Sequence, residues 1–259
     1  MDKNKFAGKV ALVTGTTHGI GQATAVRLAA EGALVAFNHR PESKPDETLR
    51  MITEAGGKGF PVCADMGKAD QVIAMIKETV QKGGRLDYIV SNAAINPALK
   101  WDETTLEEYD RLMDINLKGT WVVCQEGAKQ MIREGHGGAI VTMSSISAYV
   151  GAVDQTVYCA TKAGILMMTK ALALVLGEHG IRANCILPGS IYTNMSRNHP
   201  GSAARAFAEK KSPLKRVGAS SEIASAVSFL LSEDASYTTS AELLIDGGMI
   251  VNAEFNPTN

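Results

Sequence analysis

The stretch VALVTGTTHGIG, from Val10 to Gly21, decides the expected architecture of this chain of 259 residues. An apolar, β-branched run is followed by glycines at positions 15, 19 and 21 and then by residues with helical spacing. Glycine lets the backbone approach a pyrophosphate closely, and a helix N-terminus adds unpaired N–H groups and partial positive charge. The stretch therefore predicts a strand, a phosphate-binding loop and a helix, with an ordinary tight turn as the alternative.

The same alternation of strand and helix continues along the rest of the chain. Strands are expected at Val10–Thr14, Leu34–Phe37, Gly59–Val62, Tyr88–Ser91, Ala139–Ser144, Ala183–Leu187 and Leu243–Asp246. Helices are expected at Gly19–Glu31, Asp46–Ala55, Ala69–Gln81, Thr105–Arg133, Gln155–Glu178 and Ser221–Ser232. Several strands are apolar on both faces, which is typical of a parallel sheet between two helical layers. We expect an α/β fold with a doubly wound, Rossmann-type parallel sheet of seven strands.

The chain has no composition break that would divide it. Without a linker or an internal repeat, residues 1–259 are expected to form a single dinucleotide-binding catalytic domain. One polar segment, from Gly189 to Gly218, is longer than an ordinary loop and contains a short helix predicted near Ser202–Lys211. Segments of this length are usually functional or disordered. We predict a substrate lid at about residues 189–218.

Composition excludes several classes of partner. The 26 Lys plus Arg against 27 Asp plus Glu give a net charge of −1, so no positive field would attract nucleic acid. The charged start of the chain lacks a signal-like apolar stretch, and no run of about 18 apolar residues occurs, so we expect no membrane partner and a cytoplasmic location. Four cysteines without a CxxC pair and histidines without ligand spacing suggest neither a disulfide framework nor a metal site.

The end of the second predicted strand carries information on cofactor choice. Asn38, His39 and Arg40 stand where NAD-selective proteins of this architecture usually carry an acid for the ribose 2′-hydroxyl. The planar fork of an arginine can pair with a 2′-phosphate instead. This position predicts NADP preference with NAD tolerated. A solvated arginine in a surface loop that also holds Glu42 is the alternative.

Three side chains are candidates for proton chemistry. Tyr158 and Lys162 are four residues apart on one predicted helix and share a face, and Ser145 ends a predicted buried strand 13 residues before Tyr158. All three are expected at the carboxyl edge of the sheet, where doubly wound proteins bind ligands. A neighbouring ammonium and a positive nicotinamide would lower the pKa of a phenol from about 10. Tyr158 is therefore the expected proton shuttle.

These motifs together resemble the short-chain dehydrogenase/reductase family over nearly the whole chain. The matching residues are Thr14 through Gly21, Ser91 through Ala94, Ser145, Tyr158 with Lys162, and Pro188 with Gly189, with further marks at Asn116, Thr193 and Asp246 through Gly248. The resemblance implies an NAD(P)-dependent oxidoreductase that transfers a hydride between nicotinamide and a secondary alcohol or carbonyl.

The resemblance also implies roles for individual residues. Tyr158 would exchange the substrate proton, Ser145 would hydrogen-bond the reacting oxygen, Lys162 would hold the ribose, and Asn116 would anchor a water relay to Lys162. Asp65 would lie at the adenine, although a cap after the third strand is the alternative for it. The implied cofactor-binding set is Gly15, Thr17, His18, Gly19, Ile20, Gly21, His39, Arg40, Asp65, Met66, Asn92, Ala93, Tyr158, Lys162, Pro188, Gly189, Ile191 and Thr193.

Loops at the same edge are expected to determine the choice of substrate. Within the family, the L-rhamnose 1-dehydrogenases are resembled by four segments, Ser144 through Gly151, Gln155 through Leu166, Ile186 through Gly189 and Leu243 through Asn252. Asn96, Ser147 and Gln155, with Ser145, would offer donors and acceptors to sugar hydroxyls, although helix capping and turn bonding are alternatives for them. Oxidation of an aldose at its anomeric carbon is the leading hypothesis. The alternatives are 3-oxoacyl-[acyl-carrier-protein] reduction and a non-catalytic, cofactor-sensing scaffold.

The long helices expected at Thr105–Arg133 and Gln155–Glu178 lie in positions that pair between subunits in similar proteins. A homo-tetramer or homo-dimer is therefore expected. The tail after Gly248 either frays or reaches a neighbouring active site.

Overall fold

A parallel sheet of seven strands forms the centre of the computed structural model, which describes residues 2–193 and 199–252. The strand order is β3-β2-β1-β4-β5-β6-β9, and every neighbouring pair is parallel. The strands are β1 (Val10–Val13), β2 (Leu34–His39), β3 (Lys58–Cys63), β4 (Tyr88–Ser91), β5 (Gly138–Met143), β6 (Ile181–Pro188) and β9 (Glu242–Ile245). The predicted doubly wound, Rossmann-type sheet is confirmed, and each strand begins and ends within two residues of its expected position.

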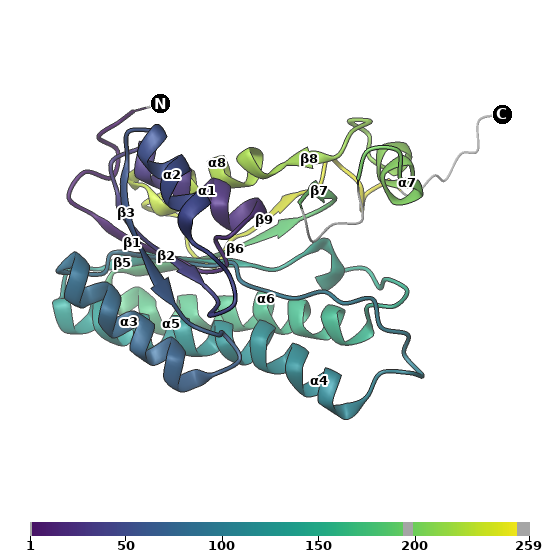
Figure 1. Ribbon diagram of the computed structural model, residues 1–259, viewed down its shortest axis with the longest axis horizontal. Coiled ribbons are helices and arrows are strands. Elements are labelled where there is room, and N and C mark those ends of the chain that lie inside the picture. Colours follow the sequence, from purple (N-terminus) through teal and green to yellow (C-terminus); the bar gives the residue numbers. More distant parts are fainter. Residues whose placement is uncertain (1, 194–198, 253–259) are drawn as a thin grey trace.

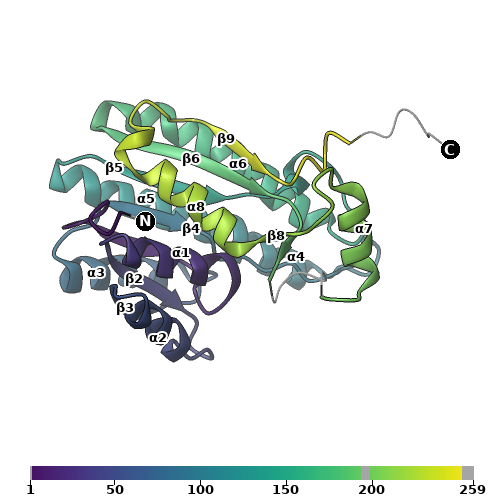
Figure 2. The same cartoon turned by 90° about the horizontal axis from the view of Figure 1, so that it is seen from above.

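Helices cover both faces of the sheet (Figures 1 and 2). One face carries α1 (Gly19–Ala30), α2 (Asp46–Glu54) and α8 (Ser220–Leu231). The opposite face carries α3 (Ala69–Gly83), α5 (Gly119–Glu134) and α6 (Thr156–Leu176). Alternate residues of β1 enter different layers, because Val13 packs with Leu28 in one buried cluster and Leu12 packs with Ile140 in another. This double burial explains the apolar strands.

The helix expected at Thr105–Arg133 is divided by a wider turn. α4 (Leu106–Leu112) begins at a capping box, in which the Glu108 backbone N–H donates to Thr105 Oγ1 over 3.2 Å. A π-helical turn at Met113–Lys118 joins α4 to α5. Such turns often occur at functional sites, and this one holds the fully buried Asn116.

Among the described residues, one helical segment, Thr156–His179, is long and apolar enough to cross a membrane by length and composition. It consists of α6 and a short 3₁₀ turn at Gly177–His179. Its Ile165 and Leu166 are buried in a cluster with Cys185 and Leu187 of β6. We therefore interpret α6 as a helix of the protein core.

The described part of the segment from Gly189 to Gly218, which leaves out residues 194–198, contains a helix and the strands of a small second sheet. α7 (Ala203–Lys211) begins at Ser202, whose hydroxyl accepts from the Arg205 N–H over 3.2 Å, so the short helix expected there is confirmed. β7 (Ile191–Tyr192) and β8 (Gly218–Ala219) form a small parallel sheet that was not predicted. Strands of two residues are too short to show alternation in the sequence.

Candidate active site

A cavity of about 830 Å³ lies along the carboxyl edge of the sheet, beside the adjacent strands β1 and β4, between which the strand order changes direction. Its volume suits a small-molecule site, and its place is where open α/β sheets bind ligands. The predicted site residues that line it are Gly15, Thr17, His18, Gly19, Ile20, His39, Arg40, Asp65, Met66, Asn92, Ala93, Asn96, Ser145, Ser147, Gln155, Tyr158, Lys162, Pro188, Gly189, Ile191 and Thr193.

Two predicted site residues lie behind the cavity wall instead of lining it. A Cβ on Gly21 would stand 2.2 Å from the Gly15 carbonyl oxygen, so this glycine permits close packing of helix on loop. The Asn116 amide bonds the backbone of Ile95, accepting from its N–H over 2.8 Å and donating to its carbonyl over 2.9 Å. Asn116 also donates to Thr161 Oγ1 over 3.3 Å, and Lys162 is not among its side-chain partners.

The glycine loop is held by two asparagines from neighbouring strand ends. Asn92 Nδ2 donates to the carbonyls of Thr14 and Gly15 over 2.9 and 3.1 Å. Asn38 Oδ1 accepts from the Gly15 N–H over 3.1 Å, while its Nδ2 donates to the Ala64 carbonyl over 3.1 Å. Asn92 thus positions the loop as well as lining the cavity. Asn38 was missed as a site residue, although a polar residue inside an otherwise apolar strand was the available signal.

The N-terminus of α1 opens into this cavity. No side chain caps it, and no acidic residue stands in its first turn. Gly19 has a φ of +64°, and a Cβ there would come within 3.2 Å of Thr193 Cβ, so a larger residue would be strained and crowded. An uncapped helix N-terminus beside a glycine-lined cavity suits an anionic diphosphate.

The outer end of the same cavity carries one cation and one acid. Arg40 is exposed, and no side-chain partner for its guanidinium is found among the described residues. The loop around it is ordered by Ser43, whose hydroxyl accepts from the Arg40 N–H over 3.0 Å. Asp65 Oδ1 accepts from the Gly67 N–H over 2.9 Å, so the strand-end cap considered for Asp65 is present alongside its place in the cavity wall.

Ser145, Tyr158 and Lys162 converge as the sequence predicts. Ser145 follows β5, and its Oγ accepts from the Ser147 N–H over 3.0 Å. The Lys162 ammonium donates to the Met143 carbonyl over 2.8 Å and lies 5.4 Å from the centroid of the Tyr158 ring. Ser144 Oγ donates to the Lys162 carbonyl over 2.7 Å, which ties the end of β5 to α6.

The electrostatics of this group differ from the sequence expectation. Burial raises the pKa of the Tyr158 phenol to about 12, and a hydrogen bond with Ser145 lowers it in part. Burial also lowers the pKa of the Lys162 ammonium to about 8. Both shifts have the same cause, since a low-dielectric surrounding disfavours the charged form. The protein groups alone therefore do not produce the lowered phenol pKa that was predicted.

Three of the candidate substrate residues have side-chain polar groups without partners among the described residues. Gln155 precedes α6 without making a side-chain cap, and no described residue bonds the Ser147 hydroxyl. Asn96 Oδ1 is buried and makes no hydrogen bond within residues 2–193 and 199–252. The capping and turn-bonding alternatives are thus not seen for these side chains.

Further residues line the cavity that were not named individually as site residues. They include Ile95, Pro97, Arg111, Ile115, Ala152, Ala204, Phe207 and Met249. Ala204 and Phe207 of α7 fall in the predicted lid, whereas Arg111 of α4 lies outside every segment that the sequence analysis assigned to the site. The described part of the chain holds no cluster of three or more His, Cys, Asp or Glu residues suited to a metal ion.

Comparison with known proteins agrees with this geometry. The family model described as Enoyl-(Acyl carrier protein) reductase matches residues 15–250. The L-rhamnose 1-dehydrogenase (NAD(P)(+)) of Sphingomonas sp. (strain SKA58) is 39% identical, covering 95% of this chain and 98% of that protein.

Solved structures are similar over nearly the whole chain. A short-chain type dehydrogenase/reductase from Mycobacterium marinum has a TM-score of 0.90 and 34% identity, over 96% of this chain and 98% of the other. A short chain dehydrogenase from Burkholderia cenocepacia J2315 in complex with NADP has a TM-score of 0.89 and 30% identity, over 95% and 100%. The chain therefore belongs to the short-chain dehydrogenase/reductase family of oxidoreductases.

Proposed function

We propose that this enzyme oxidises an aldose, L-rhamnose or a similar sugar, at its anomeric carbon to the lactone, with NADP as electron acceptor and NAD also accepted. One observation carries the proposal: the cavity that holds Tyr158 and Ser145 is also lined by Asn96, Ser147 and Gln155, whose side-chain polar groups have no hydrogen-bond partner in the described part of the chain. A sugar offers hydroxyls to such groups. Similarity to an L-rhamnose 1-dehydrogenase supports the choice.

The proposed chemistry divides between three side chains. The Tyr158 phenolic oxygen takes the proton from the C1 hydroxyl. The Ser145 hydroxyl accepts from the Ser147 N–H and hydrogen-bonds the Tyr158 phenol in the free protein, and it donates to the reacting oxygen when the substrate is bound. The Lys162 ammonium, 5.4 Å from the Tyr158 ring centroid, favours the ionised phenol. When bound, the oxidised nicotinamide supplies the acceptor for the hydride from C1 and a positive charge near the phenol. The water relay through Asn116 stays a prediction, and it would need the backbone of Asn116 because the side chain is engaged elsewhere.

The cavity residues also fit the proposed cofactor. The glycine loop and the start of α1 would hold the diphosphate, Arg40 the 2′-phosphate, and Asp65 the adenine. Thr193 would hold the carboxamide, since it lies against Gly19. Residues 189–218, of which 194–198 lie outside the described residues, would act as the lid, because Ala204 and Phe207 of α7 line the cavity. The proposed role of the tail in a neighbouring site concerns residues mainly outside the described ones.

The test is a substrate screen with purified protein. L-Rhamnose and other aldoses are assayed with NADP and NAD, and a β-ketoacyl thioester is assayed with the reduced cofactors. We expect sugar oxidation that Tyr158→Phe abolishes. Acyl turnover without sugar turnover would overturn the proposed substrate, and binding of cofactor without any turnover would favour the scaffold alternative.

Reduction of a 3-oxoacyl group remains the second candidate. Phe207 is 58% exposed on α7 and lines the cavity, so the lid offers an apolar surface to an acyl chain. The thioester arm of the screen decides between the two substrates.

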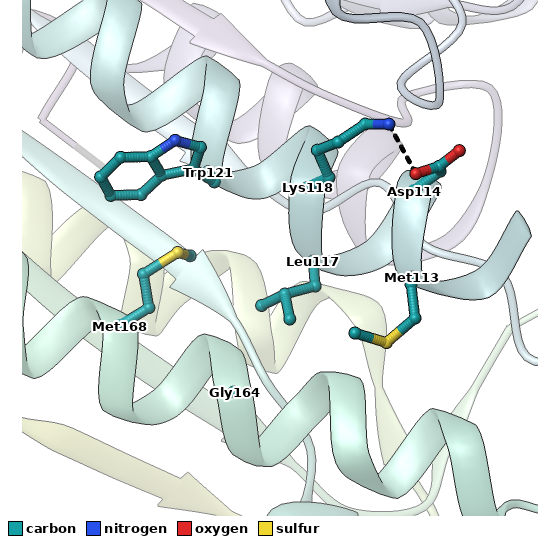
Figure 3. A pocket seen from close by; sticks show the side chains of 7 residues that line it. All are labelled: Met113, Asp114, Leu117, Lys118, Trp121, Gly164 and Met168. Atoms are coloured by element: carbon teal, nitrogen blue, oxygen red, sulfur yellow. Dashed lines mark hydrogen bonds and ion pairs between the residues drawn. The ribbon is translucent and has the colours of Figure 1, made fainter. Parts of the chain in front are cut away.

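We propose that the enzyme is a homo-tetramer or homo-dimer in which α5 and α6 pair between subunits. A shallow hollow between these helices is lined by Met113, Leu117, Trp121 and Met168 (Figure 3). Leu174 is 82% exposed on the same helix as Met168, so apolar surface extends beyond the hollow. Light scattering that shows a monomer at working concentration would contradict the assembly.

We also propose that the enzyme works in the cytoplasm. Its four cysteines are all unpaired, and Cys63 is exposed, which suits a reducing compartment. Fractionation of the source cells with an antibody against the chain would test the location.

A further inference from the structure

One polar atom in the cavity wall lacks the partner that buried polar atoms normally have. Among the described residues, two buried side-chain oxygens make no hydrogen bond, Thr24 Oγ1 and Asn96 Oδ1. Such atoms are rare in folded proteins because desolvation is not compensated. Thr24 lies inside α1 and does not line the cavity, whereas Asn96 does. Asn96 Oδ1 is thus a buried acceptor placed where a ligand can reach it.

The backbone around Asn96 is held on both sides. The residue before it, Ile95, is bonded through its N–H and its carbonyl to the Asn116 amide, over 2.8 and 2.9 Å. Pro97 follows, which restricts the conformation of the chain. Two residues later, the Leu99 N–H donates to the Asp154 carbonyl over 3.0 Å. These contacts hold the loop in place, so Asn96 is presented on a fixed backbone.

An amide oxygen only accepts hydrogen bonds, so its partner must bring an O–H or N–H group. Asn96 shares the cavity with Ser145 and Tyr158, which are assigned to the reacting oxygen. A partner of Asn96 is therefore a second group on the same substrate. A methylene, an ether oxygen or a carbonyl at that point would leave the acceptor unpaired, and unpaired buried groups reject such analogues strongly.

We propose that Asn96 determines specificity by accepting a hydrogen bond from a non-reacting hydroxyl of the substrate. This inference rests on the proposed function for the identity of the substrate as a polyol. Asn96 then selects polyhydroxylated substrates over acyl chains, which present a methylene there.

The first experiment needs no substrate. Asn96→Leu keeps the branched shape and removes the buried oxygen, so thermal unfolding should occur at an equal or higher temperature than in the wild type. Asn116→Leu, which removes an amide whose hydrogen bonds are all made within the protein, should lower the unfolding temperature. A comparable loss of stability in Asn96→Leu would mean that Asn96 has a structural role and would overturn the proposal.

The second experiment measures discrimination. Wild type, Asn96→Leu and Thr24→Val are assayed with L-rhamnose and with its 2-deoxy, 3-deoxy and 4-deoxy analogues. For one analogue, the wild-type kcat/KM should be about tenfold or more below its value for L-rhamnose. In Asn96→Leu the ratio of the two kcat/KM values should approach one, because the variant loses activity on L-rhamnose itself. Thr24→Val, which alters the other unpartnered oxygen outside the cavity, should keep the wild-type ratio.

Equal discrimination by wild type and Asn96→Leu would overturn the proposal. If no sugar is oxidised, the proposed function is wrong, but the role of Asn96 can still be tested. The ratio of kcat/KM values is then measured for the alcohol that the screen identifies and for its analogue without the second hydroxyl. Failure of that pair to distinguish the variants, or destabilisation in the first experiment, would then refute the role of Asn96 on its own.

Discussion

A buried carboxylate at the amino edge of the sheet is fully paired, whereas two polar side chains at the carboxyl edge lack side-chain partners among the described residues. At the amino edge, the buried Asp87 carboxylate accepts from the Val10 N–H over 2.9 Å, from Arg85 Nε over 2.8 Å and from Lys9 Nζ over 3.3 Å. At the carboxyl edge, Arg40 and Asn96 have no such side-chain partners among the described residues. The satisfied network serves stability, whereas the unsatisfied one is available to ligands. Changes at the two edges should therefore affect different measurements.

The largest expected effect is on turnover at the carboxyl edge. Tyr158→Phe removes the oxygen assigned to proton transfer and keeps the ring packed, so kcat should fall by about 10²–10⁴-fold. The unfolding temperature should stay close to that of the wild type. Initial rates and thermal unfolding measured on the same preparations check both parts. Retained turnover would remove the proton role from Tyr158.

The next effect is on stability at the amino edge. Asp87→Ala leaves the Val10 N–H unpaired and two cations without their carboxylate, so the free energy of unfolding should fall by about 2–4 kcal/mol. Activity per folded molecule should not change. Urea unfolding and active-site titration test this.

A matched control for Asp87 is Glu103, which pairs with Lys100 at the surface over 2.7 Å. Glu103→Ala should cost less than about 1 kcal/mol, because exposed ion pairs contribute little. Similar losses in the free energy of unfolding in the two variants would show that burial of the Asp87 network does not add to stability.

A pH-dependent effect distinguishes the edges further. The pKa of Lys162 falls from its ordinary 10.5 to about 8 in the folded protein, so the unfolded chain binds this proton more tightly. Its contribution to stability is then present above pH 10.5 and is lost as pH falls through 8. Lys162→Met should therefore be more stable than wild type at neutral pH by about 3 kcal/mol, with the gain shrinking between pH 8 and 10.5. Unfolding curves across this range measure it, and a constant difference would contradict the burial of the charged form.

The smallest expected effect concerns cofactor choice. Arg40→Ala removes an exposed cation, so KM for NADP should rise by about tenfold while KM for NAD changes little. Steady-state kinetics with both cofactors measure this. Strong preference for NAD in both wild type and variant would refute the assignment of Arg40.

Much of the fold was predictable because the pattern of apolar residues within each strand or helix indicates which of its faces are buried. The run Val10–Val13 is apolar at every position and is buried on both faces of the sheet, as a central parallel strand requires. The spacing of Tyr158 and Lys162 placed both on one face of α6, since neighbours on a helix are three or four residues apart. Segment type and the shared face of Tyr158 and Lys162 are therefore local properties of the chain.

Other features depended on partners far away in the sequence. The Asn116 side chain, within the π turn, bonds to Ile95 and Thr161, and helical periodicity does not indicate either partner. Likewise, the roles of Asn38 and Asn92 depend on a loop that begins 23 and 77 residues before them. The sequence by itself determined the strands, helices and reactive residue types, because periodic burial acts within each element. Tertiary structure alone decided which polar groups are satisfied, because hydrogen-bond partners meet only when the sheet has brought distant loops to one edge.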